Sequence, residues 1–340
     1  MPLIDFTDKG LYCSAGQFYI DPWRPVERAV ITHAHSDHAR GGSSFYLCHR
    51  LTQPILRLRL GDYVYQSVEW GEEININGVK ISLHPAGHII GSSQVRVEYK
   101  GEVWVVSGDY KVENDGLSGA FEVVKCHTFI TESTFGLPIY NWKPQQQVFG
   151  DMQHWMRDNQ SNGKTSVFIA YSLGKAQRIL QAITPVTDNI FVHGAVWNVH
   201  EALTNAGIAL PAVKRVMPDM PKDTFKNSVV IAPSSAEDTP WVKRFVPYGV
   251  GVCSGWMQVR GNARRSNVDA GFPLSDHADW KGLLSAIKAT GASKVFVTHG
   301  FQSVLSRYLN ELGIEAGEVK TEYGNDETDD EGDKPLNDQP

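Results

Sequence analysis

The stretch Ala29-Val-Ile-Thr-His-Ala-His-Ser-Asp-His38 places three imidazoles and one carboxylate directly after an apolar β run. The end of the strand presents His33 and His35 on one side, and the turn that follows carries Asp37 and His38 to another. This geometry suits two adjacent metal ions. Imidazole and carboxylate ligands favour zinc, manganese or iron, and the lack of thiolates in the stretch argues against a structural zinc site.

Further ligand-type side chains are expected at the ends of other strands. His88, Asp109 and His299 each stand beside a glycine and close to an apolar β segment. Glycine allows the backbone to bend close to an ion. One such histidine or aspartate alone is usually an ordinary turn residue. Together with the first cluster, however, the three predict a complete two-metal site.

The overall composition is that of a globular protein. Of the 340 residues, 41% are apolar and 21% are charged, and no apolar run approaches the roughly 20 residues that cross a bilayer. The N-terminus lacks the basic and then apolar segments of a signal peptide. The four cysteines stand alone in the sequence, which argues against a disulfide framework. We therefore expect a cytoplasmic protein without a membrane partner.

The net charge of −6 is concentrated at the C-terminus. Residues 325–340 hold seven acids and one base, whereas the other 324 residues carry 31 charges of each sign. An acidic segment without an apolar anchor is predicted to be a solvated, disordered tail. A solubilising role is the simpler interpretation, and a regulatory arm that competes with an anionic ligand is the alternative.

Two patterns divide the chain. Up to about residue 135, β segments dominate, with a hairpin at 11–20, strands at 28–32, 79–83 and 94–106, and a helix at 52–60. From about residue 137, strands at 166–170, 189–192 and 228–232 precede helices at 174–183, 199–205 and 236–245, which predicts a small parallel sheet. A strand after residue 271, a helix at 279–289, a strand at 294–298 and a helix at 302–312 complete the expected elements.

These motifs resemble a known family. The order His33-x-His35-x-Asp37-His38, His88 and Asp109 is that of the metallo-β-lactamase fold. Glu132, His277 and His299, in Thr131-Glu-Ser-Thr, Ser275-Asp-His-Ala-Asp and Thr298-His-Gly, resemble three further motifs of the β-CASP nucleases. Longer stretches, such as Tyr19-Ile-Asp-Pro-Trp-Arg-Pro25 and Ala170-Tyr-Ser-Leu-Gly-Lys-Ala-Gln-Arg178, are similar to bacterial DNA-ligase-associated DNA exonucleases. The resemblance covers nearly everything from Leu11 to Tyr323.

The resemblance implies an α/β fold, namely a metallo-β-lactamase αββα sandwich with an inserted β-CASP α/β domain. Residues 1–138 and 265–324 are expected to form the metallo-β-lactamase domain. Residues 139–264 would form the β-CASP domain, which would cap the metal site and shape a groove for a nucleic-acid strand. The acidic tail at 325–340 would lie outside both domains.

The same resemblance implies which residues hold the two divalent ions, with zinc as the first choice and manganese or iron as alternatives. One ion would be held by His33, His35, His88 and Asp109. The second would be held by Asp37, His38, His299 and the shared Asp109. Asp21 would fix the turn that carries the ligands.

Three residues are candidates for catalysis, namely His277, Glu132 and Asp37. His277 lies outside the metal set, after an expected strand at 271–274, and could protonate the leaving oxygen. The resemblance pairs it with Glu132, which follows an expected strand at 128–131. A histidine that caps the helix at 279 is the alternative for His277.

Substrate contacts are predicted at a basic loop and at two strand-to-helix turns. The loop would contact phosphates through Arg260, Arg264 and Arg265, or would be an ordinary solvated turn. One turn contains Ser172 and Lys175, and the other contains Ser234 and Ser235. In both, hydroxyls and the amides at a helix N-terminus could bind phosphate. A simple N-cap would have the same kind of sequence. Trp142, Trp197 and Trp256 fit a core role better than base stacking. Among the remaining histidines, His193 is the least clearly structural.

The sequence therefore predicts a metal-dependent nuclease that hydrolyses DNA phosphodiesters, as an exonuclease in end processing or repair. Its partner would be DNA that is single-stranded or has a free end. The resemblance also suggests a DNA ligase or helicase as a protein partner. The alternatives are an RNA-processing endonuclease or exonuclease of the same superfamily, and a non-catalytic repair scaffold.

Overall fold

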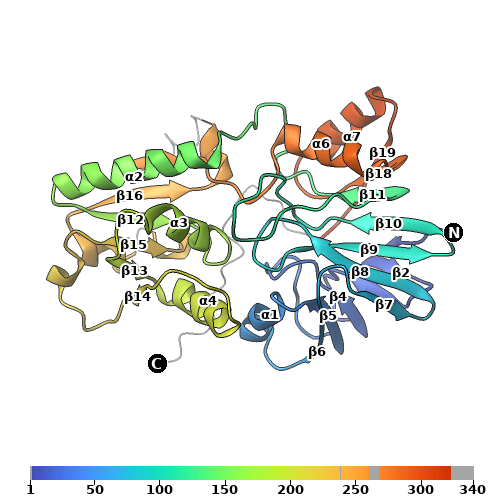
Figure 1. Ribbon diagram of the computed structural model, residues 1–340, viewed down its shortest axis with the longest axis horizontal. Helices are drawn as coiled ribbons and strands as arrows, with labels where there is room; N and C mark the ends of the chain where they lie inside the picture. The colour runs from blue at the N-terminus through green and yellow to red at the C-terminus, as the bar shows by residue number, and fades with distance from the viewer. Residues whose placement is uncertain (1, 238, 260–267, 323–340) are drawn as a thin grey trace. The chain divides into compact units, whose positions relative to one another are not determined.

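The computed structural model describes residues 2–237, 239–259 and 268–322 (Figure 1). These residues form two structural units. The first unit combines the chain up to Asn141 with the segment from His277 onward, and the inserted unit runs from Trp142 to Asp276. Strand β17 (Ala270–Phe272) lies in the inserted unit, although we expected the chain to have returned to the first domain by residue 265.

Two β-sheets make up most of the first unit. The smaller sheet has the order β1-β2-β3-β4-β5-β6, with strands Asp5–Thr7, Gly10–Cys13, Phe18–Ile20, Arg28–Val30, Phe45–His49 and Val64–Val68. The larger sheet has the order β19-β18-β11-β10-β9-β8-β7. From β7 to β11 its strands are Glu73–Ile76, Val79–Pro85, Ser93–Tyr99, Glu102–Val106 and Thr128–Thr131, and they are joined by β18 (Lys294–Val297) and β19 (Glu315–Glu318).

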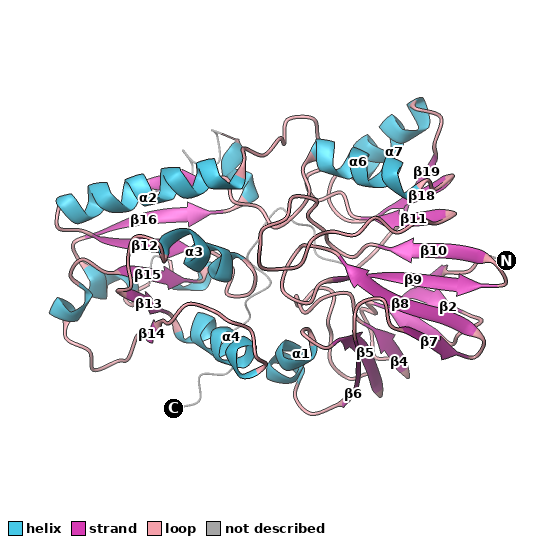
Figure 2. Ribbon diagram, in the orientation of Figure 1, coloured by secondary structure: helices cyan, strands magenta, loops and turns pink. Residues whose placement is uncertain are grey.

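The alternation of side chains along β10 explains how this unit is layered. Trp104 and Val106 pack into the core between the two sheets, whereas Val105 faces the opposite side, because successive strand residues point to opposite faces. On that opposite side lie the apolar faces of α6 (Trp280–Thr290) and α7 (Gln302–Glu311). Both helices are visible beside β11 and β18 (Figure 2). Helix α1 (Gln53–Leu60) links β5 to β6.

The inserted unit contains a six-stranded sheet in which every pairing is parallel, as the sequence predicted. Its order is β14-β13-β15-β12-β16-β17, and the strands besides β17 are Thr165–Ile169 (β12), Ile190–Val192 (β13), Lys214–Arg215 (β14), Val229–Ala232 (β15) and Tyr248–Cys253 (β16). Apolar side chains cover both faces, as is usual for a parallel sheet. Its described residues form the α-helices α2 (Gln145–Ser161), α3 (Lys175–Ile183) and α4 (Gly194–Asn205).

Some local expectations were wrong. In place of the helix at 236–245 there are two 3-10 turns, Ser234–Ala236 and Val242–Phe245. Pro240 lies between them and disfavours a helical residue before it. Helix α4 begins at Gly194 and not near residue 199. Among the described residues, no helix combines the length and apolar character that a membrane crossing requires.

Candidate metal centre

The predicted ligands of the first ion meet at the ends of strands in the first unit. His33 and His35 follow β4, His88 follows β8, and Asp109 follows β10. Each of the four offers one ligand atom, and these atoms all lie within 4.8 Å of one another. Oδ2 of Asp109 is 3.4 Å from Nε2 of His33 and 3.8 Å from Nε2 of His88. Three imidazoles and one carboxylate at this spacing have the donor set of a site for one divalent ion.

A second group adjoins the first and shares Asp109 with it. It consists of His38, Asp109 and His299, with Asp37 beside them. Nε2 of His38 lies 3.4 Å from Oδ2 of Asp109 and 3.6 Å from Oδ2 of Asp37. Nε2 of His299 lies 3.4 Å from Oδ2 of Asp37. Asp109 thus stands between two ligand groups, and the arrangement could hold two ions that share its carboxylate.

The backbone at two of these strand ends requires glycine. Gly108 has a φ of +55°, and a Cβ atom there would lie 2.6 Å from Oγ1 of Thr32. Gly300, directly after His299, has a φ of +58° and lies against the backbone of Ser133. A side chain at either position would be strained and would push the ligand-bearing segments apart.

Burial and neighbouring charges shift the pKa values in the site, and every shifted group described here except His38 moves toward the form that binds metals. Burial lowers the pKa of His33 to about 4 and that of His88 well below its usual range. Although burial raises the pKa of Asp109 and Asp37, the neighbouring histidines, His38 above all, hold both below their usual range. Burial also disfavours the charged form of His38, yet these two carboxylates raise its pKa well above 6.5. An ion would replace the proton on His38.

Two buried atoms show directly that the residues fit a metal ion. Nε2 of His33 and Oδ1 of Asp109 make no hydrogen bond to any residue that the structure describes. Buried polar atoms normally have partners, because an orphaned one costs about 1–3 kcal/mol. A divalent ion would satisfy both atoms, so the donor set and its unmet bonds agree with a metal site.

Asp21 makes hydrogen-bond contacts with two residues of the segment that carries the predicted ligands. Its buried carboxylate accepts hydrogen bonds from the backbone N–H of Thr32 at 2.8 Å and from the Thr32 hydroxyl at 2.5 Å. It also lies 2.7 Å from Nδ1 of His38. Nδ1 of His38 carries a proton toward this carboxylate, so Nε2 is the nitrogen that can bind an ion once its own proton is displaced. The Thr32 hydroxyl lies 3.0 Å from Nδ1 of His33 and has the same effect there.

His277 and Glu132 form a pair at the edge of the metal groups. Nδ1 of His277 lies 3.0 and 3.1 Å from the two carboxylate oxygens of Glu132, and both residues offer atoms within 4.8 Å of Asp109. The backbone N–H of Tyr110 donates to Glu132 at 2.7 Å, and the Tyr110 carbonyl accepts from Ala278 at 2.7 Å. Tyr110, the residue after Asp109, therefore bonds directly to Glu132 and to the residue that follows His277.

The remaining predicted site residues lie elsewhere in the chain. Arg260, Arg264 and Arg265 fall outside the described residues. In the inserted unit, Ser172 is buried, Ser234 is half-buried and Ser235 is exposed.

Three further residues of the inserted unit have contacts that bear on their expected roles. Lys175 is buried, with Nζ 3.6 Å from Oδ2 of Asp276. His193 caps α4, because its Nδ1 accepts from the backbone N–H of Ala195 at 3.1 Å. Trp197 packs against the apolar core, whereas Trp142 and Trp256 are half-buried.

Sequence reasoning missed three residues that support the site. Thr32 and Tyr110 are neighbours of predicted ligands in the sequence, and this proximity was the only available signal. It was not sufficient, because a hydrogen bond made by the backbone does not depend on the type of residue. Arg59 on α1 donates to the carbonyl oxygen of Ala34, between two ligands. Nothing in the sequence relates this helix to the ligand turn.

Comparison with known proteins gives relatives over both units. No protein-family model matches the chain. A probable DNA ligase of Opitutus terrae is 30% identical over 311 residues, which are 90% of this chain and 30% of the relative. RNase aCSPSF2 of Saccharolobus solfataricus is 25% identical over 46% of this chain and 38% of its own length. Cleavage and polyadenylation specificity factor subunit 3-I of Arabidopsis thaliana is 25% identical over 58% of this chain and 32% of its own length.

The chain therefore spans about a third of the length of these curated relatives. A crystal structure of an Enterococcus faecalis protein of unknown function has the same fold, with a TM-score of 0.59, 12% identity, and coverage of 87% of this chain and 80% of that one. The relatives, the two facing sheets and the parallel-sheet unit inserted between Asn141 and His277 agree with the fold expected from the motifs. The chain belongs to the β-CASP family of the metallo-β-lactamase fold.

Proposed function

We propose that this chain is a metal-dependent phosphodiesterase that degrades DNA from an end. One observation carries the proposal. Asp109 is shared by two ligand groups and lies within 4.8 Å of the His277–Glu132 pair. A site that holds two cations next to a proton donor has the parts that hydrolysis of a phosphodiester needs.

The two ligand groups would hold divalent ions, with zinc as the first choice and manganese or iron as alternatives. One set would be His33, His35, His88 and Asp109, and the other Asp37, His38, His299 and Asp109. The chemistry that the ions supply when bound is activation of water and neutralisation of charge on the phosphate. Asp37 would then serve catalysis as a ligand, and Asp21 would keep the Nε2 lone pairs of His33 and His38 directed to the site.

His277 would complete the reaction by giving a proton to the leaving oxygen. Water adds to phosphorus and gives up a proton to solvent, the ester P–O bond breaks, and the departing alkoxide takes the proton of the His277 imidazolium, which a proton from solvent restores. The Glu132 carboxylate stabilises the charged ring and fixes its orientation. Glu132 is held in turn by the backbone N–H groups of Tyr110 and Thr134, so the pair is preorganised.

Substitution of His277 by alanine tests this role. Loss of a general acid typically costs about 10²–10⁴-fold in rate. We expect that loss for DNA, whose leaving group is a poor alkoxide, and a much smaller loss for a p-nitrophenyl phosphodiester, whose leaving group departs without a proton. Metal content should stay at two ions per chain. Equal losses on both substrates would contradict the assignment.

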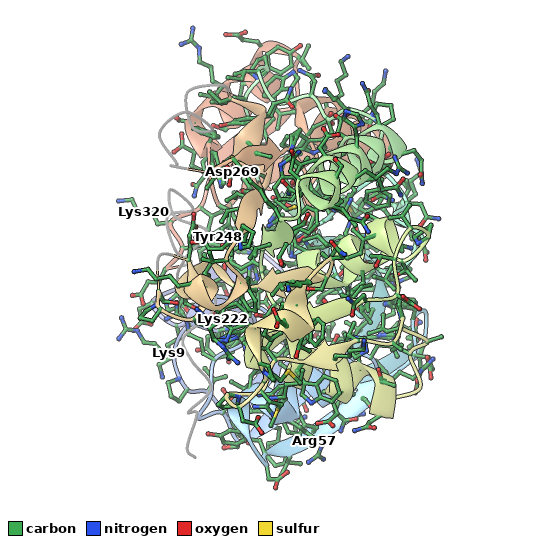
Figure 3. The ribbon with its side chains drawn as sticks, turned by 90° about the vertical axis from the view of Figure 1, so that its left-hand side faces the viewer. Lys9, Arg57, Lys222, Tyr248, Asp269 and Lys320 are labelled. Atoms are coloured by element: carbon green, nitrogen blue, oxygen red, sulfur yellow. The ribbon has the colours of Figure 1, made fainter. Side chains whose placement is uncertain are left out.

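DNA is the proposed substrate because the relative that aligns with 90% of the chain is named a probable DNA ligase. RNA is the second candidate, since a relative that aligns with 46% is named an RNase. Exposed cations are available for a phosphate backbone. In the first unit, the side chains of Lys9 and Lys320 extend away from the ribbon (Figure 3). Ser172, Ser234 and Ser235 of the inserted unit remain proposed phosphate contacts, as do Arg260, Arg264 and Arg265.

End-labelled digestion tests the substrate and the direction together. Single-stranded DNA and RNA of one sequence, labelled at the 5′ or the 3′ end, and a closed DNA circle are incubated with zinc or manganese. Mononucleotides released from linear DNA, with RNA and the circle intact, support a DNA exonuclease. Cleaved RNA reverses the preference, and a cleaved circle indicates an endonuclease. The Asp109→Asn protein controls for contaminating nucleases, and binding of DNA without any cleavage would indicate the scaffold.

A DNA ligase is the protein partner that we propose, because the aligned region of the Opitutus terrae relative is part of a longer chain named a probable DNA ligase. A helicase partner and a cytoplasmic location stay predictions from the sequence. Co-purification of a ligase with the tagged chain would support the ligase partner, provided that an excess of untagged chain abolishes it.

A further inference from the structure

A buried arginine fixes the chain segment directly before His277. Arg178 on α3 is only 1% exposed, and the two terminal nitrogens of its guanidinium donate to three acceptors. Nη1 donates to the carboxylate of Asp276 at 2.8 Å and to the carbonyl oxygen of Ser275. Nη2 donates to the side chain of Gln145 at the start of α2. One side chain thus joins two helices of the inserted unit to the two residues that precede His277.

The charges of this cluster show that Asp276 is held from two sides. Oδ1 of Asp276 bonds to Arg178, and Oδ2 lies 3.6 Å from Nζ of Lys175, one turn earlier on α3. Lys175 also lies over the ring of Tyr171, with Nζ 4.3 Å from its centroid. Two buried cations therefore converge on one buried carboxylate. Buried ion clusters of this kind often stabilise a protein no better than apolar packing would. Stability alone therefore does not account for the cluster of Arg178, Lys175 and Asp276.

The position of the cluster directly before His277 suggests its role. His277 is bonded covalently to Asp276, and its ring lies against Glu132. On its other side, the N–H of Ala278 is fixed by the Tyr110 carbonyl at 2.7 Å. Arg178 therefore fixes the local backbone conformation of the two residues that lead into His277.

We propose that Arg178 is a positioning residue for the proton donor. It holds the Ser275–Asp276 peptide so that the His277 ring keeps its place beside Glu132, and it does not itself touch the substrate. The proposal rests on the proposed function, because it acts through the role of His277 as a general acid. A misplacement of about 1 Å at a catalytic group can cost roughly 100-fold in rate, so we expect the role to be measurable.

The test compares Arg178→Met and Arg178→Lys with His277→Ala on labelled DNA and on a p-nitrophenyl phosphodiester. We expect Arg178→Met to lower kcat on DNA by about 10- to 100-fold, with KM and metal content unchanged. On the p-nitrophenyl substrate the loss should be under about threefold, because no proton donor is needed there. Arg178→Lys should recover part of the activity, since lysine keeps the charge but not the fork of donors.

A double variant separates positioning from general stability. If Arg178 acts only through His277, adding Arg178→Met to His277→Ala should cause no further loss on DNA. Additive losses would overturn the proposal, and so would an Arg178→Met defect that is equal on both substrates. Arg244→Met is the matched control, because Arg244 lies in the same unit and its guanidinium bonds to the Met217 carbonyl; it should leave kcat on DNA unchanged.

Failure of this inference can be told apart from failure of the proposed function. If His277→Ala shows the dependence on the leaving group and Arg178→Met does not, only the role of Arg178 is lost. If the wild-type chain cleaves neither substrate, or His277→Ala cleaves DNA normally, the proposed function itself fails. Should Arg178→Met not fold, Arg178→Lys and Gln145→Leu, which removes the acceptor of Nη2, carry the same comparison.

Discussion

Replacing Asp21 by asparagine should weaken metal binding, mostly at the second ligand group, without removing a ligand. The new side chain would keep an oxygen for the Thr32 backbone, but its amide NH₂ would face Nδ1 of His38. Two donors cannot share that position, so His38 would move its proton to Nε2. The nitrogen that faces Asp109 and Asp37 at 3.4 and 3.6 Å would then carry a hydrogen, which an ion would have to displace in order to bind.

The size of the effect follows from these contacts. Loss of a residue that orients a ligand typically costs about 10- to 100-fold in metal affinity, which corresponds to about 1.4–2.7 kcal/mol. The second group should bear most of this loss, because Asp21 contacts His38 directly. The first group should be affected less, because Asp21 reaches His33 only through the Thr32 hydroxyl.

Titration with zinc against a chromophoric chelator measures the two affinities separately. Thr32→Val is the matched comparison, since it removes the link to His33 and leaves the contact between Asp21 and His38. It should weaken the first ion more than the second, which is the reverse of Asp21→Asn. If Asp21→Asn binds both ions with wild-type affinity, control of the imidazole protons by Asp21 is refuted.

Two further outcomes are expected from the same structure. Gly300→Ala should lower the free energy of unfolding by about 2–4 kcal/mol in a urea titration, because φ is +58° and the new Cβ would meet the Ser133 carbonyl; unchanged stability would contradict the backbone described here. Burial lowers the pKa of His49, which is stacked on Trp70, to about 4. The unfolded chain then binds more protons than the folded one between about pH 4 and 6.5, so His49 should destabilise the fold as the pH falls through this range; an NMR titration of its ring near pH 6.5 would be evidence against this.

The ligand cluster could be predicted because chemistry and topology coincide there. His88, Asp109 and His299 each stand beside glycine at the end of a strand, and parallel or adjacent strands bring such ends together. The apolar run before His33 and the glycine between β9 and β10 were equally clear signals. These features are local in the sequence, so reading short windows was sufficient.

Other parts of the structure have no local signal. Arg178 and Asp276 are 98 residues apart, and nothing in either neighbourhood indicates that one buried charge meets the other. Helix α2 was missed although buried residues recur along it, because its sequence begins with three glutamines after Pro144 and is polar on average. The helix expected at 236–245 had the right apolar spacing, but Pro240 interrupted it.

The discontinuous first unit has a consequence for synthesis on the ribosome. Strand β11 pairs with β18, and β18 with β19, so the larger sheet stays incomplete until residues 294–318 have emerged. The inserted unit ends at Asp276 and can finish folding before then. Nascent chains arrested once residue 276 has just emerged from the ribosome should therefore contain a protease-resistant core from the middle of the sequence, while the earlier segment awaits its last strands and the last of its predicted ligands, His299.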